Sequence, residues 1–286
     1  MTQTTAPQIT LNDGHAIPQL GFGVWQVPED QVVDAVTHAL ATGYRHLDTA
    51  AAYGNEEGVG QALAASDVAR DEVFVTTKLW NDAHGRDRTL RAFDTSMDKL
   101  GLDVLDLYLI HWPVPSADAY VETWKALLEL RDSGRVRSVG VCNFHVPHLQ
   151  RLVDETGVAP AVNQIELHPY LQQRELRAYD AEAGIVTEDW SPLASGKQVM
   201  QDETIRAIAD EVGATPAQVI LRWHLQLGSV VIPKSVTPAR IEENYGALRL
   251  ELTEDQMERI GDLDRGMRTG PEPDEFAVGA VGAVTD

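Results

Sequence analysis

The chain contains little cysteine and little positive charge. Cys142 is its single cysteine, which excludes an internal disulfide and a cysteine-based zinc site. Lysine and arginine number 23 among 286 residues, against 44 aspartate and glutamate residues, which gives a net charge of -21 at pH 7. Because nucleic acids and anionic membranes bind basic surfaces, this balance argues against both as partners. A single thiol is typical of a reducing compartment, and we expect a cytoplasmic monomer.

Long apolar runs are missing as well. No run approaches the roughly 20 residues that a membrane-spanning helix needs, and no basic and apolar secretion signal is recognisable at the start. Lysine occurs at few positions, so an acidic chain that binds a phosphorylated ligand must gather its cations locally. These positions are Lys78, Lys99, Lys125, Lys197 and Lys234.

Short apolar runs alternate with amphipathic helical patterns along the chain. The strand-like runs are residues 20–24, 44–48, 73–78, 105–111, 136–143, 161–166, 185–190 and 230–233. The main helical patterns are residues 31–41, 87–100, 119–133, 148–156, 175–183, 203–212, 216–226, 238–245 and 253–263. Eightfold alternation predicts an α/β fold, a (β/α)8 TIM barrel, in one domain over residues 1–286 with extra C-terminal helices.

Both ends of the barrel carry additions. Residues 9–17 alternate around Asp13-Gly14, a pair preferred in tight turns, and predict a β-hairpin that covers one end of the fold. The tail from about 264 to 286 is expected to reach over the active site, with contacts that the sequence does not define. A doubly wound sheet is the alternative fold, but its glycine-rich fingerprint is missing. Gly58 and Gly60 come nearest to it, and we interpret them as packing residues in a helix.

The carboxyl ends of the predicted strands carry reactive and aromatic side chains. In a barrel of this kind these ends form the active site. An isolated tryptophan is usually structural, whereas four at one end of a barrel suggest an aromatic pocket. The set at the strand ends is Trp25, Asp48, Lys78, Trp80, His111, Trp112, Asn143, Gln164, Trp190 and Lys234.

Asp48, Tyr53, Lys78 and His111 form a coherent chemical unit. A tyrosine with its ordinary pKa near 10 is a poor acid at neutral pH, but a lysine cation lowers that pKa and a carboxylate holds the lysine. Carbonyl reduction needs such a placed acid while hydride reaches the carbon. Singly, each residue also has a structural interpretation, and Lys78 could instead form a Schiff base in an isomerase or aldolase.

A second group of residues surrounds a predicted helix start. Thr237 and Pro238 mark that start, and Lys234 and Arg240 bracket it. Helix amides and two cations make an anion site, and barrels often bind phosphate after their last strands. An ordinary helix cap with solvated charges is the alternative.

No metal is expected from the sequence. His145 and His148 share a predicted helix face, but no cysteine or carboxylate partner indicates a metal site. Cys142 would be a nucleophile only with a lowered pKa, and no adjacent cation suggests one.

These motifs resemble the aldo-keto reductase family, most closely its bacterial 2,5-diketo-D-gluconate reductase branch. The matching stretches follow the family's order at residues 43–54, 76–81, 106–113, 140–144, 163–169 and 232–244. The resemblance implies NADPH-dependent reduction of aldehydes and ketones, with small α-keto, dicarbonyl or sugar-derived carbonyls as substrates. An NADPH-binding regulatory subunit on the same fold, with slow turnover, is the alternative.

The resemblance also implies residue roles. Tyr53 would be the general acid, tuned by Lys78 and Asp48, and His111 would orient the substrate. The substrate would contact Trp25, Tyr53, Trp80, His111 and Trp112. The cofactor would contact Gly23, Val24, Trp25, Asp48, Cys142, Asn143, Gln164, Trp190, Ser191, Leu193, Lys234, Ser235, Val236, Thr237, Arg240, Glu243 and Asn244.

The sequence departs from the family pattern at three places. Cys142 stands where many relatives have serine, and a thiol is a weaker hydrogen-bonding group. Thr237 stands where the branch often has arginine, so NADH remains a weaker alternative cofactor. The segment 111–117 is short, which implies an open and tolerant pocket.

Overall fold

An eight-stranded parallel sheet forms the centre of the computed structural model, which describes residues 5–196 and 198–279. Lys197 and residues 280–286 of the predicted tail lie outside these ranges. The sheet order is β10-β9-β8-β7-β6-β5-β4-β3. The strands are β3 (Phe22–Gly23), β4 (His46–Asp48), β5 (Phe74–Leu79), β6 (Leu105–Ile110), β7 (Val136–Cys142), β8 (Val162–Glu166), β9 (Val186–Trp190) and β10 (Val230–Val231).

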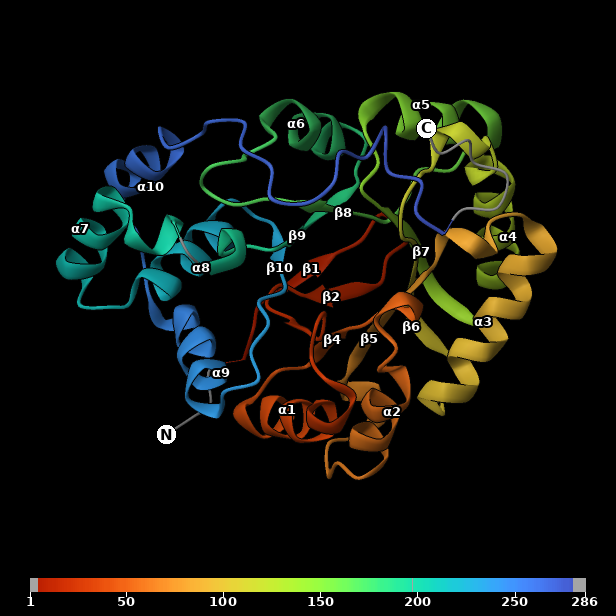
Figure 1. Cartoon of the computed structure of the whole chain (residues 1–286), viewed down its shortest axis with the longest axis horizontal. Coiled ribbons are helices and arrows are strands. Elements are labelled where there is room, and N and C mark those ends of the chain that lie inside the picture. The colour runs from red at the N-terminus through yellow and green to blue at the C-terminus, as the bar shows by residue number, and fades with distance from the viewer. Residues whose placement is uncertain (1–4, 197, 280–286) are drawn as a thin grey trace.

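The first and last strands of this sheet meet. A parallel bridge joins Leu20 to Val231, and the Gly21 amide donates to the Val231 carbonyl at 2.9 Å. The sheet therefore closes, which confirms the predicted (β/α)8 barrel (Figure 1). At this seam β3 and β10 are shorter than predicted. The Gly23 amide donates to the Pro233 carbonyl, but proline has no N–H with which to continue the ladder of hydrogen bonds.

Helices surround the barrel, as the apolar periodicity predicts (Figure 1). Several begin at side-chain caps, such as the paired bonds between Thr215 and Gln218. None of the helices in the described ranges combines the length and apolarity that crossing a membrane requires. They are α1 (Glu29–Thr42), α2 (Glu56–Ala64), α3 (Arg86–Leu100), α4 (Tyr120–Asp132), α5 (Val146–Thr156), α6 (Arg174–Glu182), α7 (Glu203–Val212), α8 (Pro216–Gln226), α9 (Pro238–Tyr245) and α10 (Glu254–Gly261).

Two glycines let α2 approach its neighbours closely. A Cβ atom on Gly58 would lie 2.2 Å from Val32 Cγ1, and one on Gly60 would lie 2.6 Å from the Leu100 carbonyl oxygen. Both distances are too short for any larger residue. The interpretation of Gly58 and Gly60 as packing residues is thus confirmed.

The N-terminal hairpin pairs β1 (Gln8–Thr10) with antiparallel β2 (Ala16–Pro18). Its turn differs from the tight Asp-Gly turn that was expected. The Leu11 amide donates to the His15 carbonyl at 2.8 Å, and Gly14 follows Asp13 with a φ of +89°, so the connection is a longer turn that closes on glycine. Leu11 and Ile17 pack in a buried cluster with residues inside the barrel. Asn12 in its turn donates to the Pro160 carbonyl just before β8 begins, so the hairpin covers the end opposite the strand carboxyl ends.

Candidate active site

A cavity of about 610 Å³ opens at the carboxyl ends of the barrel strands. Most of the polar and aromatic residues predicted at those ends line it. The lining residues are Gly23, Trp25, Asp48, Ala52, Tyr53, Trp80, His111, Trp112, Cys142, Asn143, Gln164, Trp190, Ser191, Pro192, Ile232, Lys234, Gly270, Pro271 and Phe276.

The Lys78 ammonium joins the residues of the predicted catalytic group. Its Nζ donates to Asp48 Oδ1 at 2.6 Å, to the Thr49 carbonyl at 3.0 Å and to the Tyr53 hydroxyl oxygen at 3.2 Å. Asp48 ends β4, Lys78 is the next-to-last residue of the neighbouring parallel strand β5, and both are almost fully buried. Tyr53 ends a short 3₁₀ helix (Ala51–Tyr53) that follows β4. The three donors of Lys78 are therefore all used, and its orientation is fixed.

A hydrogen-bonded chain extends from this group across the cavity floor. Gln164 Nε2 donates to Asp48 Oδ2 at 2.8 Å, and the Cys142 thiol lies 3.7 Å from Gln164 Oε1. Asn143 Nδ2 lies 3.1 Å from Cys142 Sγ, and Trp190 Nε1 donates to Asn143 Oδ1 at 2.9 Å. Residues from β4, β7, β8 and β9 thus form one network, so the floor is rigid.

The pKa of Tyr53 differs in direction from the expectation. Burial raises this pKa, and the Lys78 cation opposes burial without cancelling it. The predicted net lowering is therefore wrong for the protein alone, although lysine acts in the predicted direction. The hydroxyl stays protonated at neutral pH. Because its oxygen accepts from Lys78, its own proton is free to point into the cavity.

Lys78 stays charged in its buried position. Burial alone lowers the pKa of Lys78, but the Asp48 carboxylate at 2.6 Å more than offsets this, and the net pKa is raised. A Schiff base requires a neutral amine, so this environment disfavours the isomerase or aldolase interpretation. Burial likewise raises the pKa of the Cys142 thiol, which leaves it a poor nucleophile.

His111 contributes a neutral imidazole to the cavity wall. Burial and the nearby Lys78 cation hold its pKa well below the usual range. Its ring lies with centroid distances of 5.7 Å to Tyr53 and 5.1 Å to Trp80, both edge to face. Its Nδ1 atom is buried and has no hydrogen-bond partner within the described ranges. A neutral ring beside Tyr53 suits hydrogen bonding to a carbonyl oxygen.

The residues predicted to bind cofactor fall into two groups. The first lines the cavity, and Asn143 and Ser191 hold their side chains there with positive φ values of 64° and 49°. The second group lies in or next to α9, or just outside the cavity lining. It consists of Val24, Leu193, Ser235, Val236, Thr237, Arg240, Glu243 and Asn244.

Lys234 and Arg240 flank the start of α9 as predicted. Both side chains are exposed, and neither has a carboxylate oxygen within 4.0 Å in the part of the chain that the structure describes. The Thr237 amide donates to Ser235 Oγ at 3.0 Å, which orders the turn before the helix. Two uncommitted cations beside a helix N-terminus in so acidic a chain are suited to an anion.

The segment after α10 forms a roof over the cavity. Gly270, Pro271 and Phe276 line the cavity from above, and the Phe276 ring lies 4.4 Å from that of Trp112. A Cβ atom on Gly270 would lie 2.4 Å from Trp190 Cη2, so glycine permits the close approach. The expectation that this segment reaches the site is confirmed for the described residues.

Glu166 anchors the roof, a role that was not predicted. It is buried at the end of β8, and its Oε1 accepts from the Thr269 amide at 2.6 Å while Oε2 accepts from the Gly270 amide at 3.1 Å. The Asn163–Pro169 stretch contains Glu166, but no local pattern pairs it with a segment about a hundred residues later. Ala52, Pro192 and Ile232 also line the cavity without having been predicted.

The roof also brings carboxylates to His145. Glu272 and Asp274 approach its ring nitrogens, so the expectation that His145 lacks a carboxylate partner is wrong. His145 precedes α5 instead of sharing a helix face with His148. These contacts are not predictable from the sequence, because the carboxylates come from the tail, whose path the sequence does not define.

Comparison with known proteins gives consistent matches over nearly the whole chain. The model of the Aldo/keto reductase family matches residues 19–265. The methylglyoxal reductase DkgA of Escherichia coli is 56% identical over 269 residues, which cover 94% of this chain and 97% of that protein. An aldo-keto reductase of a Mycobacterium species is 55% identical over 271 residues, covering 95% and 98%.

Solved structures match over a similar share of the chain. A mutant of Gox0644 in complex with NADPH superposes with a TM-score of 0.91 at 51% identity, covering 94% of this chain and 98% of that chain. The Bombyx mori aldo-keto reductase in complex with NADP gives a TM-score of 0.87 at 38% identity, covering 93% and 95%.

Proposed function

The chain belongs to the aldo/keto reductase family, and from this premise we propose that it reduces small aldehydes and ketones to alcohols with NADPH. One observation carries the proposal: the buried Lys78 ammonium bridges Asp48 and the hydroxyl of Tyr53 at the floor of an aromatic cavity. Dicarbonyls such as methylglyoxal, after which its relatives are named, and other α-keto or sugar-derived carbonyls are the proposed substrates.

The residues present fit NADPH. Gln164 and Asn143 offer amide groups at the cavity floor, and the Trp190 indole offers an aromatic face to a nicotinamide ring. Lys234 and Arg240, both exposed and lacking a carboxylate partner among the described residues, would bind the phosphate on the adenosine ribose. When bound, NADPH supplies the hydride. Because Thr237 adds no third cation, we propose NADH as a weaker alternative.

Tyr53 is proposed as the proton donor. Its hydroxyl oxygen accepts from Lys78, so its proton is available to a carbonyl oxygen in the cavity. As negative charge develops on that oxygen, the Tyr53 proton moves to it, and the Lys78 ammonium stabilises the remaining phenolate at 3.2 Å. Asp48 keeps Lys78 in place and charged. Neutral His111 orients the carbonyl oxygen by hydrogen bonding.

The proposed substrate specificity follows from the cavity walls. Trp25, Trp80 and Trp112 line the substrate side, and Trp25 is 49% exposed, so the entrance is apolar and open. Flat, small carbonyls fit such a wall, and differences of one methylene are discriminated by only about 1–3 kcal/mol. A range of related carbonyls is therefore expected to react.

A panel of carbonyls assayed with NADPH and with NADH tests the proposal. Methylglyoxal, a 2,5-diketo sugar acid and a simple aldehyde are expected to oxidise NADPH with one alcohol formed per cofactor, faster than with NADH. Tight NADPH binding without turnover on any carbonyl would favour a regulatory subunit instead.

We also propose that the protein is a cytoplasmic monomer whose 286 residues form one domain. A single buried cysteine suits a reducing compartment. Among the described residues, the exposed large hydrophobic side chains are Trp25, Val236 and Val278, and Trp25 belongs to the cavity. Light scattering coupled to size-exclusion chromatography tests the oligomeric state, with a mass near 31.4 kDa expected.

A further inference from the structure

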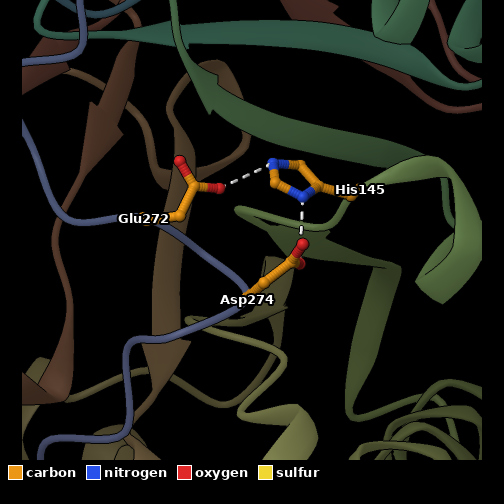
Figure 2. A group of neighbouring side chains, drawn as sticks. All are labelled: His145, Glu272 and Asp274. Atoms are coloured by element: carbon orange, nitrogen blue, oxygen red, sulfur yellow. Dashed lines mark hydrogen bonds and ion pairs between the residues drawn. The ribbon is translucent and has the colours of Figure 1, made fainter.

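A histidine and two carboxylates meet where the roof segment touches the barrel (Figure 2). His145 precedes α5 and is partly buried, whereas Glu272 and Asp274 belong to the segment after α10 and are exposed. His145 Nδ1 lies 3.0 Å from Asp274 Oδ1, and Nε2 lies 3.6 Å from Glu272 Oε1. One ligand atom from each residue lies within 4.8 Å of the others.

Both nitrogens of the His145 ring face a carboxylate oxygen (Figure 2). A neutral imidazole carries one N–H and one lone pair. Whichever tautomer is present, the lone pair of one nitrogen therefore faces the lone pairs of an oxygen, which is unfavourable. A cation shared between the nitrogen and the oxygen removes this conflict.

Among the neighbouring residues, His148 is not available as a ligand, and Arg268 orients Glu272. His148 Nδ1 accepts from the His145 backbone amide at 3.1 Å, so its Nε2 carries the proton and faces Asp274 Oδ1 at 3.5 Å. Arg268 Nε lies 3.1 Å from Glu272 Oε2, so Glu272 Oε1 remains directed at His145. Arg268 is shared with Glu166, whose Oε2 lies 3.7 Å from Arg268 Nη1, so carboxylates outnumber the guanidinium here, which favours a cation.

We propose that His145, Glu272 and Asp274 bind one divalent transition-metal ion that clasps the roof segment to the barrel. One imidazole nitrogen and two carboxylate oxygens form a ligand set that suits Zn²⁺, with water completing the coordination. Zn²⁺ holds such ligands at about 2.0–2.2 Å, so bound ligand atoms lie about 3.3 Å apart. The His145 to Glu272 separation of 3.6 Å is already close, and exposed Asp274 can rotate to join.

The position of the site gives the ion a structural consequence. Pro271 and Phe276, which flank the two carboxylates in sequence, line the cavity. An ion held between α5 and the roof therefore restrains the segment that covers the proposed substrate pocket. Neither Asp48 nor Lys78 is among the three ligands, and the ion takes no part in the proposed chemistry.

Calorimetric titration of zinc chloride into the metal-stripped full-length protein at neutral pH tests the site. One Zn²⁺ per chain is expected to bind, and Glu272→Gln and Asp274→Asn are each expected to weaken binding by about tenfold or more, as loss of a partner in a metal site does. Glu242→Gln is the matched control, because Glu242 forms an exposed pair with His38 at 2.9 Å without a second carboxylate among the described residues. No binding, or equal binding in all four proteins, would overturn the proposal.

Hydrogen exchange tests whether the ion restrains the roof segment, without any assay of turnover. Zn²⁺ is expected to slow amide exchange over residues 270–278 in the wild type but not in Asp274→Asn. Both substitutions are isosteric and exposed, and equal melting temperatures in the presence of EDTA establish that the variants fold. Zinc binding that leaves this exchange unchanged would overturn the proposal that the ion restrains the roof segment.

Discussion

The floor of the cavity and the outer part of its roof, around Glu272 and Asp274, are held in different ways. In the floor, Asp48 and Lys78 are almost fully buried and each hydrogen bond restricts the next. In the roof, the side chains of Glu272 and Asp274 are 44% and 57% exposed, and ion pairs hold them. A fully hydrogen-bonded buried network favours one geometry, whereas exposed ion pairs contribute little to the stability of the fold and rearrange easily. We therefore expect substitutions in the floor to affect the chemistry and substitutions in the roof to affect substrate binding.

Tyr53→Phe is expected to have the largest effect, because it removes the proposed acid from the floor. The turnover number should fall by about 10²- to 10⁴-fold, as loss of a general acid does, while the NADPH dissociation constant stays nearly unchanged. Steady-state kinetics and a fluorescence titration with NADPH measure the two. Tyr179→Phe, at a partly exposed helix position, is the control. An equal loss of cofactor binding would indicate a structural tyrosine.

Lys78→Met is expected to destabilise the fold as well as to impair carbonyl reduction. It leaves the Asp48 carboxylate buried without its cation, which costs about 3–5 kcal/mol in unfolding free energy. Urea denaturation measures this, with the exposed Lys125→Met as a control that changes little. A loss as small as that of the control would show that the floor is not held by this pair.

Arg240→Ala is expected to act on the cofactor alone. The Michaelis constant for NADPH should rise by about tenfold or more, since a charge-assisted bond to phosphate is lost, while that for NADH changes little. Arg206→Ala, another exposed arginine, serves as the control. Parallel increases for both cofactors would remove Arg240 from the phosphate site.

Phe276→Ala is expected to be milder, because the roof contributes contact area without chemistry. Its ring packs 4.4 Å from that of Trp112, and loss of such a pair should raise the Michaelis constant for carbonyls about two- to tenfold. The turnover number should hardly move. A large loss of turnover would contradict the division between floor and roof.

The pH dependence should show no contribution from His111. Its pKa is held well below the usual range, so lowering the pH from 8 to about 6 does not protonate it. The acid limb of kcat/KM should therefore contain no step near pH 6.5 that depends on this residue. Such a step, if it vanished in His111→Gln, would show that the ring titrates normally.

The proposed catalytic group was predictable from sequence because three of its residues lie at or next to the ends of consecutive strands. Asp48 and Lys78 end or nearly end β4 and β5, and His111 directly follows β6. Neighbouring parallel strands bring such positions together without further information. The direction of the Tyr53 pKa was not predictable in the same way, because it depends on how completely the fold removes water.

The roof was predictable only as a segment that reaches the site. It has no helical or strand periodicity, and it is held by contacts to residues about a hundred positions earlier, such as Glu166 and His145. A sequence read locally does not reveal such pairs. The hairpin turn shows the same limit on a smaller scale, since Asp13-Gly14 predicted a turn but not its length.

Hydride transfer to a carbonyl carbon is tested most directly with NADPH deuterated at the reactive carbon of its nicotinamide ring. Mass spectrometry of the alcohol formed from methylglyoxal should find one deuterium on the new carbinol carbon per cofactor oxidised, with wild-type protein and only traces with Tyr53→Phe. Cofactor oxidation that leaves no deuterium in the alcohol would contradict hydride transfer to the carbonyl carbon. The same yield from both proteins would contradict the role of Tyr53 as proton donor.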